Sequence, residues 1–324
     1  MNILLTFDYE LFFGADSGTV EKCMLEPTED LLTIAEGKNV HYTFFVDVGY
    51  LIASEGIPAL SEERAKVMGQ LETVLSKGHD VQLHIHPHWE KAKFENGKWS
   101  MHADSHYRLN NFELEEAKEI IRKYKSKLEE YVGREVTVFR AGGWCIQPFG
   151  PLSETFKEIG LVYDSSVIAG FRMVTDQYAV DFMNIDSDAE YRFSEDIALK
   201  DPNGFMTEFP ITSYRYSPLF FWSLYLKGKL NKEDHRMIGD GTYISHGSKK
   251  WQQLLSYTTG HLSTDGYYAT KLESGLESAV NLGLDKMITI GHPKGNTKYS
   301  VRLLEKFINK HAMNHRFVAF KDVT

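Results

Sequence analysis

The chain opens with an apolar run, NILLTF at residues 2–7, that leads directly into Asp8-Tyr9-Glu10. A short apolar run bounded by polar residues is typical of a buried strand. Side chains two positions apart on a strand point to the same face, so Asp8 and Glu10 would lie side by side. Two carboxylates held together repel one another unless a cation lies between them. The opening therefore predicts a strand that ends in an acidic pair, although a solvated corner with Asp8 as a helix cap is the plainer interpretation.

Short apolar runs alternate with helical patterns along most of the chain. The predicted strands are residues 2–7, 40–46, 81–85, 136–139, 161–163, 208–211, 287–290 and 317–320. The predicted helices are residues 28–36, 62–76, 112–131, 152–159, 275–282 and 299–311. Such alternation indicates an α/β fold with a parallel sheet and right-handed crossovers. About seven strand–helix units favour a (β/α) barrel over an open sheet.

The segment at about 165–288 breaks this rhythm. It contains the aromatic stretches Tyr214-Arg215-Tyr216 and Phe220-Phe221-Trp222, which indicate an insertion or lid before the last strands. The chain shows no internal repeat, low-complexity tract or Pro/Gly/Ser-rich linker. We therefore expect residues 1–324 to form a single barrel domain with an elaboration at 165–288.

Composition excludes several classes of function. The 324 residues include 36 Lys and Arg against 45 Asp and Glu, and this net charge of −9 argues against a nucleic-acid partner. No apolar run reaches the ~18 residues of a membrane span. Two cysteines cannot form a disulfide framework. The first residues lack the pattern of a secretory signal, so a cytoplasmic location is expected.

A cluster of histidines follows the strand predicted at 81–85. His84, His86 and His88 fall within five positions. His84 and His86 share a face if the strand continues, whereas His84 and His88 come together if the chain turns into a helix, for which Pro87 is a suitable first residue. Imidazoles combined with one carboxylate are typical of catalytic zinc sites. A surface loop that happens to be rich in histidine remains the alternative.

Three further strand ends carry polar residues. Arg140 can hold a carboxylate in a bidentate pair, and Gly142 and Gly143 allow backbone to approach a ligand closely. Asp164 and His292 follow two other predicted strands. Each alone is compatible with a surface ion pair, a helix cap or a structural histidine. A barrel gathers such residues at the carboxyl ends of its strands, where active sites lie.

Five stretches, in this order, resemble the motifs of the polysaccharide deacetylase family, the NodB-homology type of carbohydrate esterase. They are TFDYE at 6–10, GHDVQLHIHPH at 78–88, RAGGW at 140–144, DSS at 164–166 and TIGH at 289–292. The chain departs from the family pattern in several places. Glu10 stands in for the adjacent second aspartate of the first motif, and Ile85 replaces a small hydroxyl residue. Gly142 and Gly143, or Trp144 shifted by one, stand where the family has proline and tyrosine.

The resemblance implies a distorted (β/α) barrel that removes an N-acetyl group from a sugar or polysaccharide precursor. It implies that Glu10, His84 and His88 hold a divalent metal, with zinc as the expected ion and His86 as an extra candidate ligand. Asp8 would be the general base, paired with Arg140. His292 would protonate the leaving amine, and Asp164 would orient His292. The backbone near Gly143 and the ring of Trp144 would bind substrate.

Two other functions remain open at this point. One is a metal-dependent amide or ester hydrolase on the same barrel with a non-sugar substrate. The other is a glycan-binding protein without catalytic activity, against which the presence of Asp8, Arg140, Asp164 and His292 argues.

Overall fold

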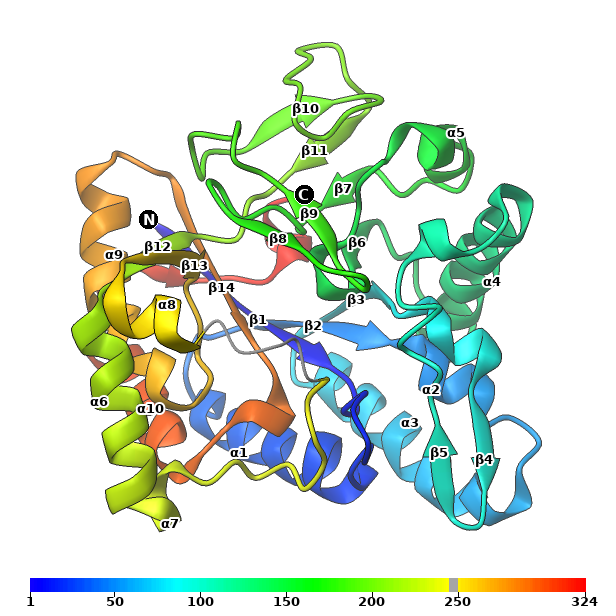
Figure 1. The fold of residues 1–324 in the computed structure, drawn as a ribbon, viewed down its shortest axis with the longest axis horizontal. Helices are drawn as coiled ribbons and strands as arrows, with labels where there is room; N and C mark the ends of the chain where they lie inside the picture. Colours follow the sequence, from blue (N-terminus) through cyan, green and yellow to red (C-terminus); the bar gives the residue numbers. More distant parts are fainter. Residues whose placement is uncertain (245–249) are drawn as a thin grey trace.

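The computed structural model describes residues 1–244 and 250–324 as an α/β structure around one curled sheet (Figure 1). The strand order is β10-β11-β7-β6-β3-β2-β1-β14, and β15 pairs with the start of β1. These strands are β1 (Asn2–Tyr9), β2 (Tyr42–Asp47), β3 (Asp80–Ile85), β6 (Val138–Ala141), β7 (Tyr163–Asp164), β10 (Tyr191–Phe193), β11 (Met206–Glu208), β14 (Lys286–Gly291) and β15 (Arg316–Phe317). All pairings in this sheet are parallel except β10 with β11. The predicted α/β class and distorted barrel are confirmed.

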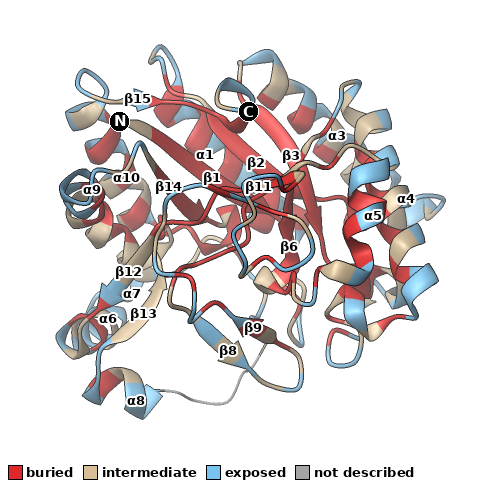
Figure 2. Cartoon of the chain, turned by 90° about the horizontal axis from the view of Figure 1, so that it is seen from above, coloured by how far each residue is buried: buried red, intermediate tan, exposed pale blue. Residues whose placement is uncertain are grey.

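Helices lie around the outside of the sheet, and the strands between them are buried (Figure 2). The longer ones are α1 (Glu26–Ala35), α3 (Ser61–Ser76), α4 (Leu114–Val132), α5 (Gly150–Glu158), α9 (Leu272–Asn281) and α10 (Lys298–His311), with the short α2 (Val48–Ala53) after β2. Apart from α2, each of these helices falls within a few residues of a predicted one, whereas α6 (Pro218–Leu230), which is 13 residues long, was not predicted. Gly133 ends α4 in the left-handed conformation, at φ +67°, which glycine adopts without strain.

The alternation of side chains along β1 separates two apolar clusters. Ile3, Leu5 and Phe7 point outward into the large core beneath the helices. Leu4 points inward and packs with residues on other strands or just after them: Phe45, Val138, Phe209, Ile288, Val318 and Phe320. Because the period of a strand is two, Asp8 continues the inward row that Leu4 begins. The barrel interior is therefore apolar at the amino ends of the strands and polar at their carboxyl ends.

Two predicted strands end earlier than expected. β11 ends at Glu208, where a strand over 208–211 was predicted, because Pro210 has no N–H to continue the ladder. β15 ends at Phe317 and is followed by a 3-10 turn at Phe320–Asp322, whose Asp322 side chain accepts a hydrogen bond from the Ala319 N–H.

The segment at 165–288 forms small elements at the mouth of the barrel. They are β8 (Arg172–Val174), β9 (Ala179–Asp181), β12 (Ser213–Tyr216), α6 (Pro218–Leu230), α7 (Lys232–His235), α8 (Lys250–Leu255) and β13 (Thr258–His261). The β4–β5 hairpin (Lys93–Glu95 and Lys98–Ser100) also lies outside the main sheet. None of these strands was predicted.

This segment also bridges the gap between β11 and β14. The Thr212 N–H donates to the Ile288 carbonyl at 2.9 Å, and the Leu262 N–H donates to the Thr212 carbonyl at 2.7 Å. The Ile290 N–H in turn donates to the Leu262 carbonyl at 3.1 Å. The free edge of β14 is thus covered by backbone hydrogen bonds. No helix in the described part of the chain combines the length and the apolar character needed to cross a bilayer.

We expect His79, before β3, to make stability depend on pH. Its buried Nδ1 accepts the Tyr42 N–H at 3.0 Å, so the ring is held neutral. Burial, and then the nearby His41, Lys321 and Lys77, lower its pKa to about 4. The unfolded chain takes up a proton near pH ~6.5 that the folded chain refuses, so this stabilisation is present above that pH and is lost as the pH falls towards 4.

The variant His79→Asn keeps an acceptor atom without a titrating group. It should be less stable than the original chain at pH 7, and this difference should shrink at pH 5. Urea unfolding at the two pH values measures it, and a difference that stays constant would contradict the expectation.

Candidate functional site

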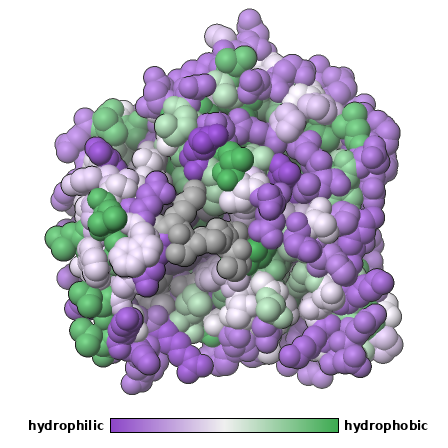
Figure 3. Space-filling model, in the orientation of Figure 1, coloured by the Kyte–Doolittle hydropathy of each residue, from purple (hydrophilic) through white to green (hydrophobic). Residues whose placement is uncertain are grey.

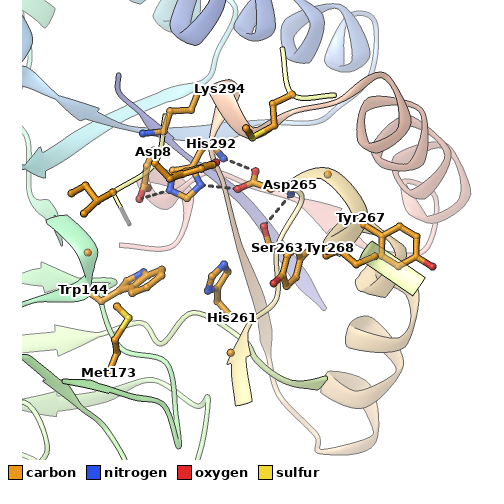
Figure 4. Close-up of a pocket in the computed structure, with 18 of the residues that line it drawn as sticks. Asp8, Trp144, Met173, His261, Ser263, Asp265, Tyr267, Tyr268, His292 and Lys294 are labelled. Carbon is orange, nitrogen blue, oxygen red and sulfur yellow. Dashed lines mark hydrogen bonds and ion pairs between the residues drawn. The ribbon is translucent and has the colours of Figure 1, made fainter. Parts of the chain in front are cut away.

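The carboxyl ends of the parallel strands open into one cavity of about 620 Å³. Asp8 and Glu10 come from the end of β1 and the residue after it, His84 and His86 from β3 and the residue after it, and His292 from the residue after β14. All five line the cavity. Figure 4 shows Asp8, His292 and Asp265 converging at its deep end, with Trp144 and His261 further out. The predicted gathering of strand-end residues is what the fold produces.

Asp8 and Arg140 form a buried ion pair across the barrel interior. Arg140 Nη1 lies 2.7 Å from Asp8 Oδ1 and 2.9 Å from Thr6 Oγ1. Its Nε donates to the Ser165 carbonyl at 2.8 Å, and the guanidinium lies 3.9 Å above the centre of the Phe45 ring. Burial alone would raise the pKa of Asp8, but the charges of Arg140, His84 and His292 lower it below its ordinary value. Asp8 is therefore held as a carboxylate.

Glu10 shares one oxygen with two histidines. Its Oε2 lies 3.2 Å from His84 Nε2 and 2.8 Å from His86 Nε2. His84 Nδ1 lies 2.9 Å from the Arg140 carbonyl, which can only accept, so the proton sits on Nδ1 and the Nε2 lone pair of the neutral ring faces Glu10. Two lone-pair atoms facing each other call for a cation between them. Burial lowers the pKa of His84, but Asp8 and Glu10 outweigh burial and raise this pKa to about 9. A proton on Nε2 therefore serves as the cation when no other cation is present.

The group of possible ligand atoms is Glu10, His84 and His86, all within 4.8 Å of one another. His88, the residue expected to join Glu10 and His84, is not part of it. His86 still has extended backbone, with φ −111° and ψ 97°, so it stays on the face of His84. The chain then turns into a 3-10 helix at Pro87–Lys91. His88 is turned into an aromatic pocket, with its ring parallel to that of Tyr107 and its centre 4.6 Å from that of Phe13.

Lys294 is a site residue that the sequence analysis missed. The buried ammonium lies 2.8 Å from Glu10 Oε1, the carboxylate oxygen that the histidines leave free. It also lies 4.8 Å from the centres of the Phe12 and Phe13 rings. Burial raises the pKa of Glu10, but Lys294, His86 and His84 together lower it well below its ordinary value. Lys294 therefore fixes Glu10 as a carboxylate with Oε2 directed at the histidines.

His292 is oriented by Asp265, not by Asp164 as predicted. His292 Nδ1 lies 2.7 Å from Asp265 Oδ2, and the backbone N–H of His292 donates to Asp265 Oδ1 at 2.7 Å (Figure 4). Its Nε2 faces the acidic pair, at 3.8 Å from both Asp8 Oδ2 and Glu10 Oε1. Burial alone would lower the pKa of His292, but Asp265, Asp8 and Glu10 raise it.

Asp164 has a different place in the structure. Its carboxylate accepts hydrogen bonds from the N–H and the hydroxyl of Ser166, both at 2.9 Å. It sits beside Glu208 in the register of β7 and β11, and burial raises the pKa of both acids. The Ser166 hydroxyl in turn accepts from the Ala141 N–H. Asp164 thus supports the strand end that carries Arg140 and makes no hydrogen bond or ion pair with His292 within the described residues.

The glycines after β6 make room for the site. A Cβ on Gly142 would lie 2.6 Å from His86 Nδ1, so only glycine lets that ring reach Glu10. Gly143 has φ +57°, and a Cβ there would lie 2.6 Å from the Tyr178 ring. Gly143 and Trp144 line the cavity, as expected of residues that meet substrate. The Trp144 ring lies 5.0 Å from that of His261.

Aromatic residues of the 165–288 segment form much of the outer wall. Those lining the cavity are Phe171, Tyr178, Tyr216, Phe221, Tyr243, Tyr267 and Tyr268. Tyr178 donates a hydrogen bond to the Tyr107 hydroxyl at 2.9 Å across the rim. The 165–288 segment therefore forms part of the cavity wall, and it supplies Asp265 and His261 to the site.

Comparisons with known proteins identify the fold. No family model matches the chain, and no curated protein sequence matches it. Among solved structures, a Mycobacterium smegmatis protein assigned as a polysaccharide deacetylase is similar with a TM-score of 0.55 and 16% identity, over 99% of this chain and 88% of that one. The Puue allantoinase is similar with a TM-score of 0.51 and 11% identity, over 99% and 88%.

A third structure extends this range. The 4-alpha-glucanotransferase from Thermococcus litoralis has a TM-score of 0.55 and 12% identity, over 99% of this chain and 40% of that protein. At these identities the likeness establishes a shared fold. The chain has the polysaccharide deacetylase fold that its five motifs imply, and this fold also occurs in proteins with other activities.

The close approach at Gly142 leads to a prediction about stability. Gly142→Ala should cost about 1–3 kcal/mol, because the new Cβ would press on His86 and on the Ile85 carbonyl. Gly69→Ala is the matched control. Gly69 lies within α3 with no atom near the added Cβ, so alanine should add about 0.5–1 kcal/mol of helix stability. Urea unfolding compares the two, and equal stability of both variants would contradict the packing argument.

Proposed function

We propose that this chain is a metal-dependent hydrolase that removes an N-acetyl group from a sugar or polysaccharide precursor. The observation that carries the proposal is the convergence of Glu10, His84 and His86 beside an ion-paired Asp8 and an oriented His292. The deacetylase fold and the five motifs support it. The cavity combines aromatic walls with polar groups at its floor, which is the kind of lining expected of a site that binds a sugar.

The three ligand residues suit a small divalent cation. Ligand atoms at ~2.0–2.2 Å from a tetrahedral ion lie ~3.3 Å apart, close to the spacings of 2.8 and 3.2 Å between Glu10 Oε2 and the two imidazole nitrogens. The second nitrogen of His84 is hydrogen-bonded to a backbone carbonyl, as is usual for a metal-ligating histidine. One carboxylate with two imidazoles favours zinc, which we propose as the ion. That ion would polarise the acyl oxygen and acidify a water molecule.

Asp8 is suited to accept the proton of the attacking water. Arg140 occupies Oδ1, so Oδ2 is the oxygen that faces the cavity and His292. Because Asp8 is held ionised, it is ready as a general base at neutral pH. As the water oxygen bonds to the acyl carbon, the proton passes to Asp8.

His292 is suited to act as the acid. Its raised pKa favours the protonated ring, whose Nδ1–H is held by Asp265 while Nε2–H faces the reacting groups. When the carbon–nitrogen bond breaks, the leaving amine takes this proton. Acetate and the free amino sugar result. Asp265 thereby has the positioning role that aspartate has in catalytic triads.

A non-sugar amide is the second candidate substrate. It is favoured by the shared fold with an allantoinase, whose name denotes a non-sugar substrate. Acetate release from N-acetylated sugars, compared with hydrolysis of cyclic and linear amides, distinguishes the two substrates. Metal binding with no turnover of any acyl substrate would instead favour a glycan-binding protein.

The matched variants His86→Phe and His88→Phe test which histidines hold the metal. His86→Phe should lose bound zinc and lower acetate release by ~10²–10⁴-fold, because an imidazole ligand is removed. His88→Phe should keep both, since His88 lies outside the ligand group. Elemental analysis of dialysed protein and turnover on an accepted substrate are the measurements. Loss of zinc in His88→Phe with retention in His86→Phe would restore the ligand set expected from the motifs.

A second pair, Asp265→Asn and Asp164→Asn, tests the assignment of the orienting carboxylate. Asp265→Asn should lower kcat by ~10²–10⁴-fold. It should also move the alkaline limb of kcat/KM to lower pH, because loss of the carboxylate lowers the pKa of His292. Asp164→Asn should leave the position of that limb unchanged. The opposite pattern would return the role to Asp164.

A further inference from the structure

Helix α6 is apolar on both of its faces, but only one face is covered. Phe220 and Phe221 are buried against Tyr216 and Leu254. On the other side, four residues spaced by three or four positions are exposed: Leu219 (74%), Trp222 (46%), Leu226 (53%) and Leu230 (83%). A surface helix of a soluble domain normally presents polar residues to water, and a helix that is apolar all round is normally buried. Within the described residues, nothing covers the outer face of α6, although its apolar composition is typical of a covered face.

Helix α8 extends this apolar surface. Trp222 Nε1 donates to the Leu254 carbonyl at 3.2 Å, which sets the outer face of α6 beside the end of α8. Trp251 and Leu255, one helical turn apart, are 69% and 76% exposed. We call Leu219, Trp222, Leu226, Leu230, Trp251 and Leu255 the α6–α8 surface. Apolar residues are visible over α6 at the left margin of Figure 3.

The helices that form this surface carry only positive charges, and the acids that follow α6, on α7, are paired, Glu233 with Lys298 and Asp234 with Arg302. Residues 211–232 and 250–264, which include α6 and α8, contain five basic residues and no acidic one: Arg215, Lys227, Lys229, Lys232 and Lys250. The whole chain carries −9, so the other residues carry −14. Lys227 and Lys229 are exposed between Leu226 and Leu230. The exposed apolar surface thus has a local excess of basic residues on a protein whose net charge is negative.

We propose that the α6–α8 surface docks on an anionic lipid membrane. Exposed leucine and tryptophan with lysines at their margin are the composition of helices that lie in the membrane interface. Each lysine near an anionic leaflet adds about 1 kcal/mol of attraction. A symmetric contact with a second copy would instead place five positive charges against five. The membrane is therefore the occupant that both the apolar residues and the charges favour.

Docking in this way would also place the cavity at the lipid surface. Phe221, Leu224 and Gly228 of α6 line the cavity, so its wall and the docking surface are two sides of one helix. An α-helix with side chains is ~10–12 Å across. If the proposed hydrolysis is correct, the site is placed to meet an acyl sugar carried on a lipid. The docking itself does not depend on that activity.

Sedimentation of the full chain with lipid vesicles tests the proposal. The chain should bind vesicles that contain phosphatidylglycerol, bind pure phosphatidylcholine vesicles weakly, and lose binding as salt rises. Leu226→Glu/Leu230→Glu should weaken binding by more than ~10-fold, because two apolar side chains no longer enter the interface. Lys227→Glu/Lys229→Glu should weaken it by a similar factor. The matched control Met183→Glu/Leu199→Glu, at exposed apolar residues elsewhere, should bind as the original chain does.

Three outcomes would overturn the proposal. One is no binding of the original chain to anionic vesicles, and another is undiminished binding of Leu226→Glu/Leu230→Glu. The third is a dimer in light scattering that this variant abolishes while vesicles are not bound, which would make the surface a contact between copies. Thermal melting checks that each variant is folded, and salt dependence of the original chain needs no variant. Turnover in solution should be unchanged in the variants, so a failure of docking and a failure of the proposed activity are told apart.

Discussion

The burial of two carboxylates on one strand is the constraint on which the rest of the site depends. Asp8 and Glu10 are almost fully buried and two positions apart, and an unpaired buried charge is very costly. The structure gives each acid its own cation, Arg140 for Asp8 and Lys294 for Glu10. It places His84 between them, 3.6 Å from Asp8 and 3.2 Å from Glu10. The one carboxylate oxygen on each acid that faces the cavity is then the oxygen available for chemistry.

Much of this arrangement could be predicted because it follows from short-range rules. Apolar runs located the strands, and the rule that parallel strands deliver their ends to one side brought Asp8, Glu10, Arg140 and His292 together. The choice between His86 and His88 could not be made in the same way. It depends on whether the chain leaves β3 as strand or helix, and the turn begins only at Pro87, one residue too late to exchange the two rings.

The two residues that were missed differ in how visible they were. Lys294 lies two positions after His292, the spacing of Asp8 and Glu10 and of His84 and His86, so its position in the sequence was a signal, although its backbone lies in the 3-10 helix Pro293–Gly295 and not in a strand. Asp265 lies on the 165–288 segment, 27 positions before His292, with no pattern that ties it to β14. Its place is set by the crossing of that segment over the barrel, through the Thr264 N–H donated to the Ile290 carbonyl. A contact between such distant parts of the chain cannot be predicted from local sequence periodicity.

Arg140 joins parts of the barrel that do not pair with one another. Its guanidinium donates to Asp8 and Thr6 on β1 and to both the carbonyl and the hydroxyl of Ser165, just after β7. Two strands, β2 and β3, separate β1 from β6 in the sheet. The guanidinium therefore connects strands that are not neighbours, across the interior of an incompletely closed barrel. Lysine, with a single nitrogen, could not span the same points. The same side chain therefore both connects the strand ends at the mouth and keeps Asp8 ionised, so any replacement of Arg140 would alter the two together.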